Sequence, residues 1–352
     1  MAMQHWDHKF LTKMEMFSMK KTIVLIAVLV LVVGTAFAAP TFSGNFGFDY
    51  KFSLDGDIAT SGYDGTAGAA DISLSLSDDF YSIGLRNSID GDAALNAKDW
   101  YATATVKVSE ILKSIDIELP VTLNALVGNQ NFFNASAYTD PSGAEGDNYA
   151  LYSNSVDRAN IPFGVTVGLD GIGSATVGYD LLGEGVFAGA TVTPVDGVSL
   201  AGAVVNDATF DSYAPGGKAM TASAAVDIAA FAGLNFDLSV AGSTWIAFDA
   251  DDQNLYFAAV SGGKDAVSGY VEYTNEQTVS NMNVGAGFQV SDASKLSAGV
   301  GVSDLGGDNT LGAYAKGTYT IAGITTFVKY GFDNNGEASS DHYIQTGLDL
   351  SF

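Results

Sequence analysis

The residue types that most often carry enzyme chemistry come together at one place in this sequence. His342 directly follows Ser340 and Asp341, and the other two histidines, His5 and His8, lie within the first ten residues. A serine, a histidine and an acid are the members of a nucleophilic relay. Neighbouring residues of a strand point to opposite faces, so Asp341 and His342 are poorly placed to pair if this segment is a strand. We therefore expect no enzyme.

Metal and cofactor chemistry find little support. The sequence contains no cysteine, which excludes disulfides, thiol chemistry and cysteine metal sites. Asp249, Asp251, Asp252 and Asn254 carry the oxygen ligands that calcium prefers, but the glycine and terminal glutamate of an EF-hand loop are missing. No glycine-rich nucleotide-binding motif stands at a strand-to-helix junction. We expect neither a cofactor nor a metal site.

The N-terminal segment has the pattern of a secretory signal peptide. Lys20 and Lys21 precede an almost wholly apolar run over 22–33, and Ala36 and Ala38 lie at the spacing that a signal peptidase accepts. A transmembrane helix is the alternative, but the run is shorter than the roughly 20 residues that span a bilayer. The sequence thus predicts three segments: an extension or misassigned start over 1–18, a signal peptide over 19–38, and one mature domain over 39–352.

The mature domain is strongly acidic. The whole chain is 47% apolar with a mean hydropathy of +0.18, and it holds 15 Lys and Arg against 40 Asp and Glu. Four of those bases and two of those acids precede residue 39, which leaves the mature domain a formal net charge of −27. Nucleic acid is polyanionic and is therefore disfavoured as a partner.

Apolar and polar residues alternate along the whole mature chain. Over 42–54 the even positions are Phe, Gly, Phe, Phe, Tyr, Phe and Leu, whereas the odd positions are Ser, Asn, Gly, Asp, Lys and Ser. Because successive strand side chains point to opposite faces, the pattern predicts strands with one apolar and one polar face. It recurs over 70–77, 100–109, 282–290 and 295–302, with turn-rich pieces in between.

Such one-sided strands build both soluble sandwiches and membrane barrels. The segments here run to roughly the 9 to 11 residues that a tilted membrane strand needs. An open sheet would leave backbone groups unpaired in lipid, so membrane strands must close into a barrel. We therefore predict an all-β, transmembrane, antiparallel up-and-down β-barrel, with a soluble secreted sandwich as the alternative.

The last strand carries the most specific resemblance to a known family. Phe352, preceded by the alternating Leu348 and Leu350, resembles the C-terminal signature that the barrel-assembly machinery reads in Gram-negative outer-membrane proteins. With the export signal and the alternation, the mature chain resembles a general porin in pattern. The resemblance implies a location in the outer membrane among lipid and lipopolysaccharide, a water-filled channel for small hydrophilic solutes and cations, and a homotrimer.

Topology sets the strand number. Both ends of such a barrel lie on one side of the membrane, so the number is even and short turns alternate with longer loops. We expect eighteen strands, with sixteen as the alternative because the Ala-rich stretch 219–261 is ambiguous. Pro120 cannot donate a ladder hydrogen bond, which implies a bulge or a wrong boundary in the fifth strand. The expected strands are 41–54, 69–77, 80–89, 99–109, 114–127, 161–169, 174–182, 185–193, 197–205, 219–229, 233–241, 254–261, 267–275, 281–290, 294–302, 310–320, 324–333 and 342–352.

A barrel of this size encloses an aqueous channel, lined by the polar face of its strands. The longest connection, about 128–160, follows the fifth strand and resembles the third loop of porins, which folds inward and narrows the channel; a surface-exposed loop is the alternative. A Lys or Arg on the lipid face at mid-membrane would cost about 2 to 4 kcal/mol of stability. Bases that face inward therefore need no functional explanation. The expected pore-lining and constriction residues are Lys51, Arg86, Lys107, Lys316 and Lys329 on the wall, with Asp140, Glu145, Asp147, Asp157 and Arg158 on the loop.

The longer connections are rich in acidic residues. Carboxylates around a channel mouth favour cations, so we predict weak cation selectivity. In the alternative interpretations these acids keep the surface soluble, bind divalent ions between lipopolysaccharide molecules, or belong to a surface antigen or adhesin. The acidic connections lie at 55–64, 90–92, 249–252, 304–308 and 333–341.

Overall fold

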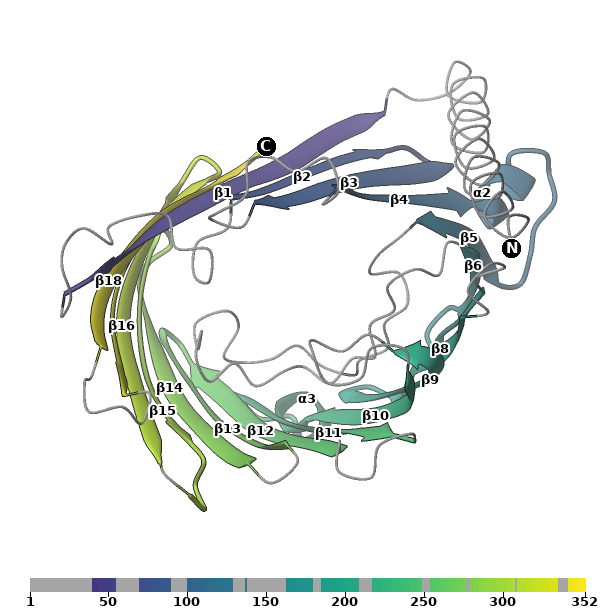
Figure 1. Ribbon diagram of the computed structural model, residues 1–352. Helices are drawn as coiled ribbons and strands as arrows, with labels where there is room; N and C mark the ends of the chain where they lie inside the picture. Colours follow the sequence, from purple (N-terminus) through teal and green to yellow (C-terminus); the bar gives the residue numbers. More distant parts are fainter. Residues whose placement is uncertain are drawn as a thin grey trace, which may run out of the picture.

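Eighteen antiparallel strands form one closed sheet, viewed along its axis in Figure 1. The predicted barrel and its strand number are confirmed. The computed structural model describes residues 40–54, 70–89, 100–128, 137, 163–179, 185–208, 217–248, 254–276, 279–307, 309–334 and 341–352. The predicted extension over 1–18 and signal peptide over 19–38 lie outside these residues.

The strands and the two helices are bounded as follows. The first nine strands are β1 (Thr41–Ser53), β2 (Ala70–Ser77), β3 (Tyr81–Ile89), β4 (Trp100–Lys107), β5 (Thr122–Gly128), β6 (Phe163–Leu169), β7 (Gly173–Tyr179), β8 (Val186–Val195) and β9 (Val198–Ala208). The other nine are β10 (Gly217–Asp227), β11 (Asp237–Ala247), β12 (Asn254–Lys264), β13 (Val267–Glu276), β14 (Val279–Ser291), β15 (Ser294–Ser303), β16 (Thr310–Ile321), β17 (Ile324–Asn334) and β18 (Asp341–Ser351). The helices are α2 (Val108–Lys113) and α3 (Ile228–Ala232).

The barrel closes where β1 pairs with β18. Phe352 extends that seam, because its N–H donates to Gly44 O at 3.0 Å and its carbonyl accepts from Gly44 N at 2.9 Å. The rings of Phe352 and Phe42 lie 5.8 Å apart between centroids. Leu348 and Leu350 are opposite phenylalanines of β1 in the same seam. Closure leaves no open sheet edge, which is what a lipid environment requires.

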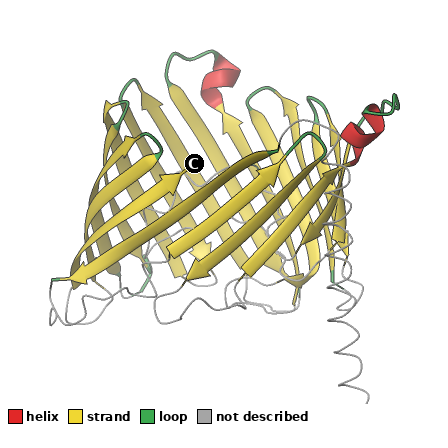
Figure 2. Ribbon diagram, turned by 90° about the horizontal axis from the view of Figure 1, so that it is seen from above, coloured by secondary structure: helices red, strands yellow, loops and turns green. Residues whose placement is uncertain are grey.

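The connections differ between the two ends of the barrel. Short turns such as 170–172, 196–197 and 322–323 join strands at one end, and Figure 2 places α2 and α3 at that end as well. Most connections at the other end are longer and acidic, as the alternation of turns and loops predicts. None of the helices in the described ranges is long and apolar enough to cross a membrane.

Predicted strand boundaries are wrong around both short helices. α2 replaces the end of the predicted strand 99–109, which stops at Lys107, and α3 lies between β10 and β11, where the predicted strands 219–229 and 233–241 were too close together. The segment predicted as strand 114–127 begins only at Thr122, since Asp116 has a φ of 61° and Pro120 cannot donate to a ladder. Residues 228–232, divided between a predicted strand and turn, are helical. Asp227 caps that helix by accepting from Ala230 N at 3.0 Å, and Gly233 ends it with a φ of 63°.

The pairing register gives the sheet two distinct faces. Val300 of β15 lies on one face of the sheet and is 49% exposed. Lys329 of β17 lies on the other face and is 3% exposed. A single curved sheet spreads side chains on its convex side and brings them together on its concave side. The exposed apolar row is therefore the outer surface, and the covered polar row is the inner wall, as the alternation predicts.

Candidate functional site

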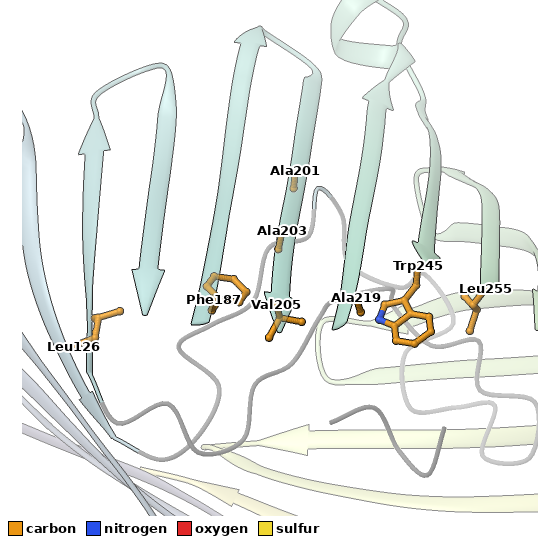
Figure 3. Close-up of a cluster of buried hydrophobic side chains, with 8 residues drawn as sticks. All are labelled: Leu126, Phe187, Ala201, Ala203, Val205, Ala219, Trp245 and Leu255. Carbon is orange, nitrogen blue, oxygen red and sulfur yellow. The ribbon is translucent and has the colours of Figure 1, made fainter. Parts of the chain in front are cut away.

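One part of the inner wall is apolar. We call this part the apolar wall. Its side chains come from β5 and from β8 to β12. The two largest are Phe187, which is fully buried, and Trp245, which is 2% exposed. Figure 3 shows the eight residues on their strands: Leu126, Phe187, Ala201, Ala203, Val205, Ala219, Trp245 and Leu255.

Ala137 packs against the apolar wall. Its N–H donates to the hydroxyl of Ser223, on β10, at 2.9 Å. Ser223 is buried and lies on the inner face, because its neighbours Ala222 and Ala224 are exposed. Ala137 is the described residue of the connection between β5 and β6, so this connection touches the inner wall there. The predicted constriction residues Asp140, Glu145, Asp147, Asp157 and Arg158 lie outside the described residues.

A second part of the inner wall carries tyrosines that cover glycines. Tyr270 pairs with Gly285, Tyr314 with Gly299 and Tyr343 with Gly331. All six residues lie in one cross-strand row from β13 to β18. A Cβ at any of these glycines would collide with the paired ring, so each ring lies flat on the backbone of the neighbouring strand. The hydroxyls of Tyr270 and Tyr314 meet at 3.2 Å.

Two predicted bases lie among these tyrosines. Lys316 and Lys329 are directly opposite each other on β16 and β17. Lys329 Nζ lies 5.4 Å from the ring centroid of Tyr314 and 6.0 Å from that of Tyr343, and Lys316 Nζ lies 4.5 Å from that of Phe327. These distances are those of cation–π contacts. We call this region the tyrosine–lysine wall: Tyr270, Tyr314, Lys316, Phe327, Lys329, Tyr343 and Gln345.

The other three predicted bases do not all join this wall. The register places Lys51 opposite Gln345, which in turn is opposite Lys329. Arg86 shares that face through β2, but the side chains of Lys51 and Arg86 lie outside the described ones. Lys107 is instead tied to a turn, since its Nζ donates to Asp78 O at 2.6 Å.

Glu272 and Lys295 are inner-wall charges that the predicted site omits. Glu272 is fully buried on β13 opposite Asn283, and Lys295 lies opposite Gln289 near the turn end of β15. Both follow from the alternation alone. The tyrosine–glycine pairs do not, because they become visible only when the strand register is known.

The histidine that raised an enzyme hypothesis lies on the outer face. His342 is opposite Phe332, with ring centroids 4.9 Å apart, and its Nδ1 lies 2.5 Å from the hydroxyl of Tyr330. A tyrosine and a phenylalanine thus lie beside the imidazole, and Ser340 lies outside the described residues. Among the residues that the structure describes, no three acids or histidines gather as a metal site would require.

Solved structures share this fold. A mutant of the Rh. blastica porin is 15% identical with a TM-score of 0.55, and the match covers 89% of this chain and 100% of that porin. The fold of this chain is that of porins. OprB of Pseudomonas putida is 10% identical with a TM-score of 0.52, covering 92% of this chain and 96% of OprB. OccAB2 of Acinetobacter baumannii is 10% identical with a TM-score of 0.50, covering 89% and 98%. No family model and no curated protein matches the sequence.

Proposed function

We propose that this protein is an outer-membrane porin, a water-filled channel for the passive diffusion of small hydrophilic solutes and ions. The observation that carries the proposal is a closed barrel of eighteen strands, apolar outside, with an inner wall that bears lysine, glutamate and amide side chains. Barrels with this many strands are too wide for wall side chains alone to fill. The likeness to porin structures supports the channel fold.

The constriction lies between the two parts of the inner wall. The contact between Ala137 and Ser223 supports an inward course of the connection after β5. The acids of that connection, Asp140, Glu145, Asp147 and Asp157, then face Lys316 and Lys329, with Arg158, Lys51 and Arg86 adding positive charge. Acidic connections at the mouth make the channel weakly cation-selective for monovalent ions.

Export and assembly complete the proposal. A signal peptide over 19–38 directs export, and Leu348, Leu350 and Phe352 are the signal for the barrel-assembly machinery. The seam of the barrel supports this assignment, because Phe352 extends the pairing of β1 with β18. The mature chain contacts lipid and lipopolysaccharide and forms a homotrimer. N-terminal sequencing of protein from isolated outer membranes tests export, with Ala39 expected as the first residue.

Single-channel recording in planar bilayers tests the channel itself. Purified, heat-modifiable protein should give discrete steps whose conductance rises with KCl concentration, because ions cross a water-filled pore. Under a KCl gradient the reversal potential should have the sign of cation preference. Folded barrels that insert without conducting would contradict the channel and favour the surface antigen or adhesin, whereas clear anion preference would contradict only the proposed selectivity.

A further inference from the structure

The connection between β4 and β5 is longer and more apolar than the short turns at its end of the barrel. The two residues 196–197 are enough to join β8 to β9, whereas 108–121 contains α2 and a further stretch without strand. Three large aliphatic side chains of that stretch face solvent: Ile115 is 61% exposed, Ile117 47% and Leu119 37%. Apolar surface gains free energy by leaving water, so three such side chains on one short segment indicate a surface that another molecule covers.

Hydrogen bonds hold this apolar stretch, residues 114–119, which we call the rim segment. The N–H groups of Ile115 and Ile117 both donate to Leu112 O, each at 3.0 Å. The hydroxyl of Ser109, at the start of α2, accepts from the N–H of Leu123 on β5. Both ends of the connection are therefore tied down, and the exposed side chains project from a fixed backbone.

The rim segment lies beside the barrel and away from the channel. Figure 1 shows the connection through α2 outside the ring of strands, and Figure 2 shows it at the rim. The strand that follows it has its outer face directly below, because Leu123 is opposite Val167, which is 39% exposed on the outer surface. The rim segment therefore continues the apolar outer surface of the barrel at the edge of that surface.

The charges of the connection fit one kind of membrane surface. Asp116 and Glu118 alternate with the aliphatic side chains of the rim segment. In α2, Glu110 lies in the first turn and the exposed Lys113 in the last. Three acids and one base give 108–121 a formal net charge of −2. An anionic membrane surface would repel this charge, whereas a zwitterionic one would not.

We propose that the rim segment inserts Ile115, Ile117 and Leu119 into the adjoining leaflet of zwitterionic phospholipid, at the boundary between headgroups and acyl chains. Peripheral segments that carry apolar side chains together with charged ones lie at this boundary. The rim segment then fixes the depth and the tilt of the barrel at its turn end, where a two-residue turn is too short to reach sideways into lipid. The inference goes beyond the proposed function, because it requires a barrel in a membrane but no conduction.

Spin labels on single cysteines test the insertion, since the chain has no cysteine of its own to compete for the label. The folded barrel is studied in phosphatidylcholine vesicles. Asp196→Cys is the matched control, because Asp196 is exposed in a two-residue turn at the same end. A nitroxide at Ile117→Cys should collide readily with oxygen, which concentrates in the bilayer, and should be about threefold less accessible to a water-soluble nickel chelate than the control. In vesicles of anionic phosphatidylglycerol this protection should fall, and equal protection there would overturn the preference for zwitterionic lipid.

A label at Val300→Cys, on the outer face of β15, separates failure of this inference from failure of the proposed function. Nickel accessibility at both Val300 and Ile117 would overturn the membrane barrel and the proposed function with it. Nickel accessibility at Ile117 equal to that at Asp196, with Val300 protected, would overturn only the insertion of the rim segment. A label at Ile117 that is shielded from oxygen and nickel alike would show a protein contact, such as a second copy of this chain, and would also overturn the insertion into lipid.

Discussion

The apolar wall and the tyrosine–lysine wall belong to one sheet but fix their side chains in different ways. In the apolar wall, small and apolar residues face inward and Ala137, from a distant connection, packs against them. In the tyrosine–lysine wall the contacts between described residues come from the neighbouring strands, as Tyr314 on Gly299 shows. Among the described residues, one wall is therefore contacted by a segment from elsewhere in the chain, and the other by residues of its own strands in a fixed register.

This difference shows that inward-facing residues play different roles in different parts of the inner wall. Alternation decides only which residues face inward, and both walls obey it. Inward alanine and tryptophan mark the side that packs against another segment of the chain, because apolar surface gains from leaving water. Inward lysine and glutamine mark the side on which polar and charged groups gather on the inner face. The narrowest passage should then be bounded by chain on one side and by charge on the other.

Removing a large side chain from the apolar wall should have the largest effect. Trp245→Ala leaves a cavity where a nearly fully buried ring now packs, and should cost about 3 to 5 kcal/mol of unfolding free energy. Urea unfolding of the barrel in micelles measures this loss. Tyr256→Ala, an exposed aromatic on the outer face of the next strand, is the control and should change stability far less. Equal losses would mean that the apolar wall is not a packed core.

Overpacking the tyrosine–lysine wall should have a smaller effect. Gly331→Ala puts a methyl group into Tyr343, and overpacking of this kind costs about 1 to 3 kcal/mol. In Gly317→Ala the new Cβ would make an ordinary contact with Leu296 at 3.5 Å, so that variant should be nearly neutral. Unchanged stability in Gly331→Ala would show that the Tyr343 ring has room to move.

More of the fold than of the candidate site could be predicted from the sequence. Alternation over 282–290 and 295–302 located β14 and β15, because period-2 burial is a local property. The same pattern misled at 115–119, where Ile115, Ile117 and Leu119 alternate with acids but are exposed beyond α2. A strand also needs a partner, which local pattern does not report. The pairing of Tyr343 with Gly331 and of Lys316 with Lys329 depends on register between strands and stayed hidden for that reason.

Loss of the contact between the apolar wall and Ala137 should have the smallest effect and the most local one. Ser223→Ala removes the hydroxyl that accepts from Ala137 N, a hydrogen bond worth about 0.5 to 1.5 kcal/mol. Because the packing of Ala137 remains, the barrel should stay folded, while its open-channel current becomes noisier as the connection after β5 is held less firmly. Ser297→Ala, on the inner face of β15, should keep the wild-type noise. Identical recordings from both variants would show that the hydroxyl does not steady the passage, and the apolar wall would then hold the connection by packing alone.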